Sequence, residues 1–128
     1  MPEAPRSPGD HLPLTVPVFQ ILLSLADLDL HGYAIIQDIR ARTGGEVRLT
    51  ASTLYAAIKR LLAGGLIEEL DERPDPALDD ARRRYYRITA FGRDVARQEA
   101  ARLHRLTLMA REKHLLPEPA RAGQRETR

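Results

Sequence analysis

Residues 48–70, RLTASTLYAAIKRLLAGGLIEEL, carry a helix pattern that stops abruptly and turns into a strand pattern. Leu54, Ile58 and Leu61 recur at the spacing of one helix face, which predicts that this face is buried. Gly64 and Gly65 follow, and glycine is the usual residue just after a helix C-terminus. The strand-forming segment LIEEL comes next. We therefore expect a helix that packs beside a small sheet.

The opposite face of this helix is small and nearly uncharged. Ser52, Ala56, Lys59 and Ala63 lie there when the residues are placed at the angular spacing of an ideal helix. Small residues let a helix backbone come close to DNA, while short hydroxyls reach base edges and long basic side chains reach phosphates. The same pattern also fits an ordinary surface helix, because alanine is simply a good helix former.

The rest of the chain supplies three more helices and a hairpin. Apolar stripes predict helices that begin near residue 14 and near residue 33, and the second of these stops at Gly44-Gly45. Thr50 is a suitable N-cap for the third helix, Ala51 to Leu62, with its hydroxyl accepting from Ser52 or Thr53 N–H. LIEEL and RYYRIT form a hairpin, called the wing below, and a long helix runs from Thr89 to a stop at Pro117.

This order predicts a mainly α fold with a small β-hairpin, namely a winged helix-turn-helix followed by a long C-terminal helix. We expect residues 13–88 to form the winged helix-turn-helix and residues 89–116 the C-terminal helix. The proline-rich segment 1–12 and the polar segment 117–128 are expected to be disordered.

Three consecutive arginines, Arg82, Arg83 and Arg84, lie at the base of the returning strand of the wing. Arginines at such a position rest on the phosphate backbone or reach the minor groove of DNA. The alternative is a solvated charge run that nearby acids neutralise. The wing carries five such acids: Asp71, Glu72, Asp75, Asp79 and Asp80.

Composition removes several classes of protein. The chain has no cysteine, so disulfides, thiolate metal sites and a cysteine nucleophile are excluded. His104 and His114 are spaced wrongly for two ligands on one helix face, and we expect no metal and no cofactor. No nucleophile elbow or phosphate-binding loop is present, so we do not expect an enzyme. The sequence carries no signal-peptide pattern and no apolar stretch long enough for a bilayer, so we expect a cytoplasmic protein without membrane contact.

Three segments, LHGYAIIQDI, TASTLYAAIKRLLAGGLIE and RRRYYRITAFGR, together resemble the PadR family of bacterial transcriptional regulators. The resemblance covers roughly residues 14–115 and is closest to the smaller members, which have a single C-terminal helix. It implies a repressor that binds a palindromic operator in double-stranded DNA as a homodimer. It also implies that a small aromatic effector releases the DNA in some members.

The resemblance and the helix geometry together define the predicted site residues. The predicted DNA contacts are Tyr33, Thr50, Ser52, Thr53, Tyr55, Lys59, Arg60, Arg82, Arg83 and Arg84. The predicted dimer interface is a narrow stripe on the last helix, formed by Val95, Ala96, Glu99, Leu103, Leu106 and Ala110. Such a stripe packs either on its own domain or against a second copy.

Two features depart from the family pattern. The wing is longer and more acidic than is usual, and the chain has no tryptophan on which a flat aromatic effector could stack. The alternative function is a winged-helix module that binds a protein partner without contacting DNA, since a fold does not determine a function. Steeply salt-dependent DNA binding would distinguish the two.

Overall fold

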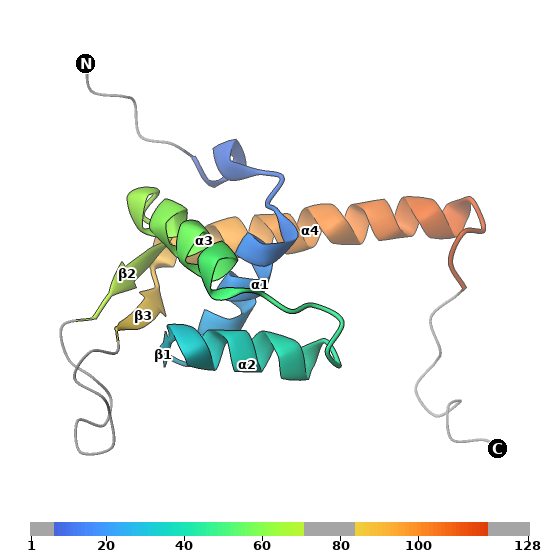
Figure 1. The fold of residues 1–128 in the computed structure, drawn as a ribbon. Coiled ribbons are helices and arrows are strands. Elements are labelled where there is room, and N and C mark those ends of the chain that lie inside the picture. Colours follow the sequence, from blue (N-terminus) through green and yellow to red (C-terminus); the bar gives the residue numbers. More distant parts are fainter. Residues whose placement is uncertain (1–6, 71–83, 118–128) are drawn as a thin grey trace.

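The computed structural model describes residues 7–70 and 84–117. It contains four α-helices, a short 3₁₀-helix and a three-stranded sheet within these residues (Figure 1). In chain order the elements are η1 (Pro8–His11), α1 (Val16–Leu25), β1 (Leu30–His31), α2 (Gly32–Arg42), α3 (Ala51–Ala63), β2 (Ile67–Glu69), β3 (Tyr85–Ile88) and α4 (Ala90–Glu112). The predicted winged helix-turn-helix class is therefore confirmed.

Side-chain caps start the helices where the sequence predicts them. The Thr50 hydroxyl accepts a hydrogen bond from Thr53 N–H at 3.1 Å, and the Thr89 hydroxyl accepts one from Gly92 N–H at 2.9 Å. Thr15 caps α1 in the same way, and Pro17 occupies the first turn of that helix, where a missing N–H costs little. These caps set the first residue of α1, α3 and α4.

One core joins α1, α2, α3, the wing and the start of α4. Its fully buried large side chains are Ile21, Leu22, Leu25, Ile35, Ile39, Leu54 and Val95. Ile58, Leu61, Tyr86 and Ile88 close the same cluster. Burial of each such side chain is worth about 1.5–3 kcal/mol. The stripe predicted for α3 therefore does face the interior.

The sheet has one strand that the sequence analysis did not predict. β3 is central in the order β1-β3-β2, and both pairings are antiparallel. Ile67 pairs with Ile88 as expected for the hairpin, whereas Leu30 pairs with Tyr86 from the far side. β1 is only two residues long, so it has no alternating pattern that could reveal it.

Two predicted boundaries are wrong. Part of the segment 1–12, expected to be disordered, forms η1, and the His11 ring packs edge-to-face on Phe91 of α4 at 5.3 Å. The C-terminal helix was expected to reach Pro117, but α4 ends at Glu112. His114 adopts a positive φ of 62°, and Leu115 N–H donates to the Ala110 carbonyl, which is a common way for a helix to end.

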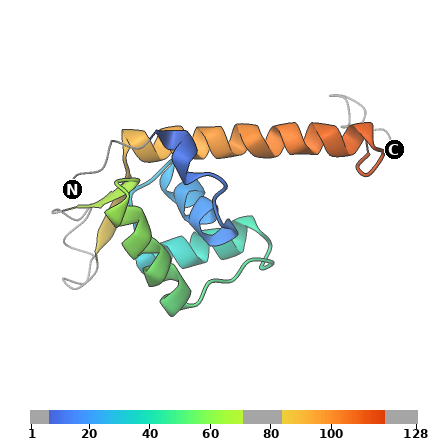
Figure 2. The same ribbon diagram turned by 90° about the horizontal axis from the view of Figure 1, so that it is seen from above.

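α4 has two halves with different surroundings. Its first half lies along η1 and α1, whereas its second half extends beyond the rest of the domain (Figures 1 and 2). A search of the described helices for one long and apolar enough to cross a membrane finds none.

Candidate nucleic-acid interface

The outer face of α3, defined by Ser52, Ala56, Lys59 and Ala63, is exposed. The other side of the helix is held by Leu54, Ala57, Ile58 and Leu61, all at 2% exposure or less. The face therefore cannot rotate inward, and its small side chains leave the backbone accessible to a partner. A helix surface with these properties can enter a DNA major groove.

The hydroxyl groups at the start of α3 are not equivalent. Thr50 uses its oxygen to cap the helix and also donates to the Thr53 hydroxyl at 3.0 Å. Ser52 is exposed, and no side-chain hydrogen bond to it exists among the described residues. Ser52 is therefore the hydroxyl that is available to an external partner, while Thr50 and Thr53 hold each other in position.

The His-Gly-Tyr segment at 31–33 places an aromatic group beside α3. His31 Nδ1 accepts from Ala34 N–H at 3.2 Å and so caps α2. A Cβ on Gly32 would overlap the hydroxyl of Tyr55 and lie 2.9 Å from its Cζ, so glycine at this position lets the Tyr55 ring lie against the start of α2. Tyr33 then projects to solvent at 61% exposure, and Tyr55 of α3 is 49% exposed.

A polar network fixes α2 against α1. The Arg42 guanidinium donates to Asp38, Ser24 and the Gln20 side chain at distances of 2.7–2.8 Å. Partial burial opposes ionisation of Asp38, but the hydrogen bonds from Arg42 and Ser24 outweigh it and lower the pKa of this carboxyl. These bonds therefore hold α2, the helix that carries Tyr33 on its first turn, against α1.

Of the three arginines predicted for the wing, the described residues include Arg84. Arg84 is exposed and forms an ion pair with Glu69 at 2.9 Å across the base of the wing. Arg82 and Arg83 lie outside the described residues. Arg87 forms an ion pair with Asp29 at 3.0 Å. Arg84, which we predicted to contact DNA, is therefore already paired with Glu69 within the chain.

The predicted dimer stripe divides into two parts. Val95 is fully buried and Glu99 is 2% exposed in the single chain, so neither is available to a second copy, and this part of the prediction is wrong. Ala96 also packs against the core. Leu103 and Leu106, one and two turns farther along, are 37% and 48% exposed, and Ala110 is half-buried.

Glu99 is buried because it has a specific partner. Arg102 donates two hydrogen bonds to the carboxylate, at 2.7 and 2.8 Å. These bonds lower the pKa of Glu99 against the opposing effect of burial. The pair ends the buried half of α4 and explains why an acid could appear within the apolar stripe.

The sequence analysis did not predict a surface hollow along α2, which Tyr33, Arg40 and Arg48 help to line. Its signal in the sequence was weak, because the two arginines are eight residues apart and belong to different elements. The part of the chain that the structure describes holds no group of three or more His, Asp or Glu side chains arranged for a metal ion.

An exposed helix with a small polar face, held by two preceding helices and followed by an antiparallel wing, defines a winged helix-turn-helix protein. The family model for the transcriptional regulator PadR-like family matches residues 21–98, more than half of the chain. The chain belongs to the PadR-like family of transcriptional regulators. The family is one of transcriptional regulators.

The chain is also similar to solved structures and to a curated protein sequence. A transcriptional regulator from Clostridium thermocellum is 30% identical with a TM-score of 0.65, and the match covers 78% of this chain and 90% of that one. A PadR family transcription regulator from Clostridium difficile is 23% identical with a TM-score of 0.63, over 77% and 97% of the two chains, and this supports the fold. An uncharacterized 37.1 kDa protein of a Streptomyces fradiae transposon is 37% identical over 87 residues, which are 68% of this chain and 23% of that protein. The chain thus spans less than a quarter of that relative.

Proposed function

We propose that this chain is a sequence-specific repressor that binds a palindromic operator as a homodimer, with α3 in the major groove. The observation that carries the proposal is the outer face of α3, which is exposed, small and free of acidic side chains, with Ser52 and Lys59 directed to solvent. Tyr33 and Tyr55 flank it as exposed aromatic groups. Each element of the face matches a way in which helices contact bases or phosphates.

Dimerisation is supported by the second half of α4. Leu103, Leu106, Leu108 and Met109 are all more than one third exposed on a segment that extends beyond the domain (Figure 2). An apolar surface of this kind marks an interface, and a two-fold pair is the commonest arrangement. A two-fold dimer would carry two copies of α3 to half-sites about one DNA turn apart.

The test is fluorescence anisotropy with DNA from upstream of the protein's own gene, compared with scrambled DNA at two salt concentrations. We expect a preference of about a thousandfold for the upstream DNA and a steep fall in affinity with salt. Weak and equal binding to both DNAs would contradict the proposal and would favour the protein-interaction module instead.

The proposal includes release of the DNA by a small aromatic effector, and its support is the family resemblance alone. Phenolic and other aromatic compounds titrated into the protein–DNA complex test this part. A compound that lowers the anisotropy of bound operator without unfolding the protein would support it, and a panel without effect would contradict it.

A further inference from the structure

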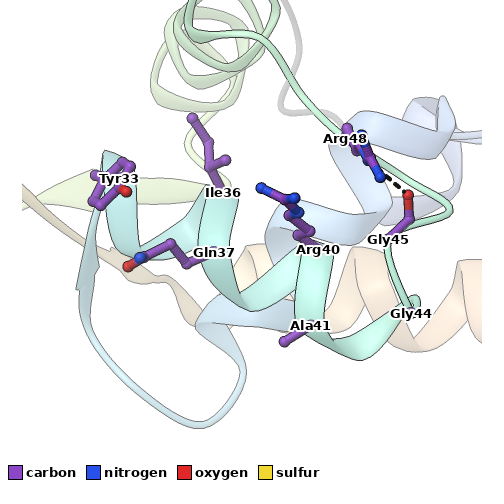
Figure 3. A pocket seen from close by; sticks show the side chains of 8 residues that line it. All are labelled: Tyr33, Ile36, Gln37, Arg40, Ala41, Gly44, Gly45 and Arg48. Atoms are coloured by element: carbon purple, nitrogen blue, oxygen red, sulfur yellow. Dashed lines mark hydrogen bonds between the residues drawn. The ribbon is translucent and has the colours of Figure 1, made fainter.

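A hollow of about 600 Å³ lies between α2 and the loop that leads to α3 (Figure 3). Residues of one side of α2 and of the following loop line it: Tyr33, Ile36, Gln37, Arg40, Ala41, Gly44, Gly45 and Arg48. The hollow is open to solvent, and all three of its long polar side chains, Gln37, Arg40 and Arg48, are exposed. It is thus a surface groove rather than part of the core.

Positive charge dominates this groove. Neither Arg40 nor Arg48 has a carboxylate within ion-pair distance among residues 7–70 and 84–117, and no acidic side chain lines the hollow. Arg48 is held by one neutral contact, in which its Nε donates to the Gly45 carbonyl at 3.0 Å. That bond directs the guanidinium along the loop and leaves its other N–H donors unused. Two unneutralised guanidinium groups in one groove are suited to an anionic partner.

The groove lies beside the start of α3. Tyr33 lines the hollow and is 61% exposed, and it directly follows Gly32, which lies against Tyr55 and Leu54 of α3. Arg48 stands two residues before Thr50, the N-cap of α3, so the positive end of that helix lies at the groove's edge. A DNA duplex that received α3 in its major groove would therefore bring a strand of its backbone over the hollow.

We propose that Arg40 and Arg48 bind a phosphodiester of the DNA backbone beside the major groove that α3 enters, with Tyr33 and Gln37 as additional donors. This inference rests on the proposed function and adds a backbone contact on the α2 side of the recognition helix. The planar guanidinium fork matches the geometry of a phosphate group, which accepts two parallel hydrogen bonds. Such a contact positions the protein and carries no sequence information itself.

The test compares the wild type with the double variant Arg40→Ala/Arg48→Ala over a salt titration, on upstream and on scrambled DNA. Arg97→Ala/Arg105→Ala on α4 is the matched control, since it also removes two exposed arginines. We expect the groove variant to weaken binding to both DNAs by the same factor. Loss of the contact to this one phosphate should reduce the slope of log affinity against log salt by about 0.9. The control should retain the wild-type slope.

A second arm locates the contact on the DNA. Single phosphates flanking the operator are replaced by neutral methylphosphonates, one position at a time. At the contacted position the substitution should weaken the wild type but have no further effect on the groove variant. Additive losses at every position, or an unchanged salt slope in the variant, would overturn this inference alone. Failure of the wild type to bind DNA at any salt concentration would overturn the proposed function as well.

Discussion

Lys59 is the charged member of the outer face of α3, and within the described residues its ammonium group has no carboxylate partner. Lys59→Ala should therefore weaken binding to every DNA sequence and reduce the salt slope by about one. Anisotropy at several salt concentrations measures both. Lys113→Ala, at the far end of α4, is the control and should leave the slope unchanged. An unchanged slope in Lys59→Ala would show that this face does not contact DNA.

Ser52 differs from Lys59 in what its loss should change. Because its hydroxyl is exposed and has no partner in the described chain, Ser52→Ala should relax discrimination at one operator position by about 1–3 kcal/mol. Binding to a set of single-base operator variants measures this. Thr53→Ala is the comparison, since the Thr53 hydroxyl is already engaged by Thr50. Equal weakening on all variants would instead identify Ser52 as a phosphate contact.

Glu99 gives a prediction about stability and pH. Its pKa in the folded protein is lower than the ordinary value of 4.5, because Arg102 donates to the ionised carboxylate. The stabilisation is therefore complete above about pH 4.5 and is lost as the pH falls through the lower, folded-state pKa. Glu99→Gln should lower the urea midpoint at pH 7 and differ progressively less from the wild type as the solution is acidified.

The control for this experiment is Glu112→Gln, which removes an exposed acid from the same helix. Its urea midpoint should stay close to that of the wild type at neutral pH. If Glu99→Gln matched the wild type at pH 7, the Glu99–Arg102 pair would contribute nothing to stability.

At the scale of elements, the junction between the wing and α4 is packed too tightly to accept a larger side chain at Gly92. Thr89 donates its hydroxyl to the Gly65 and Leu66 carbonyls, and a Cβ on Gly92 would overlap the Leu66 carbonyl oxygen. Because the obstacle is backbone, no side-chain rotation can relieve it. Gly92→Ala should lower the free energy of unfolding by about 3 kcal/mol, although alanine alone would favour a helix by about 1 kcal/mol.

Chemical denaturation measures the effect of Gly92→Ala, with Gly9→Ala in η1 as the control. A Cβ on Gly9 meets its nearest atom at 3.5 Å, an ordinary contact, so this variant should stay within about 0.5 kcal/mol of the wild type. Wild-type stability in Gly92→Ala would mean that the start of α4 is able to move away from Leu66.

Elements whose signals are local could be predicted from the sequence. The stripe of Leu54, Ile58 and Leu61, the Thr50 cap and the Gly64-Gly65 stop lie within one segment, and α3 was predicted to within one residue of its observed end. β1 could not be predicted, because it is defined by a distant partner, whereas η1 carries a local capping signal from Ser7 to Asp10 that the sequence analysis missed. Leu30 forms a strand only by pairing with Tyr86, and His11 is ordered against Phe91.

At the scale of the whole molecule, periodicity could not separate the two uses of α4. The periodicity placed Val95 and Leu106 on one stripe. It does not show which part of this stripe packs on the domain and which part extends beyond it. In the structure Val95 is buried within its own domain and Leu106 is exposed. The groove that contains Arg40 and Arg48 also could not be predicted from the sequence, because it depends on how the loop folds back along α2.

The exposed half of α4 yields a prediction for the assembly. Leu106→Glu should convert a dimer to a monomer, because it places a charge in the apolar surface that would be buried between two copies. Analytical ultracentrifugation measures the mass, and operator affinity should fall with it. Leu28→Glu, at a site that is 62% exposed on the loop after α1, is the control and should remain dimeric. A monomeric wild type, or a dimeric Leu106→Glu variant, would contradict the assignment of this surface.

Because α4 is held at its start and is long, a small tilt there gives a larger displacement at its far end. Its 23 residues span about 34 Å, so a tilt of about 5° at the end held by Leu66 moves the other end by about 3 Å. That held end is joined to the wing and to the core beneath α3. In the proposed dimer, a change in the angle between the two copies of α4 would therefore displace the two copies of α3 relative to each other.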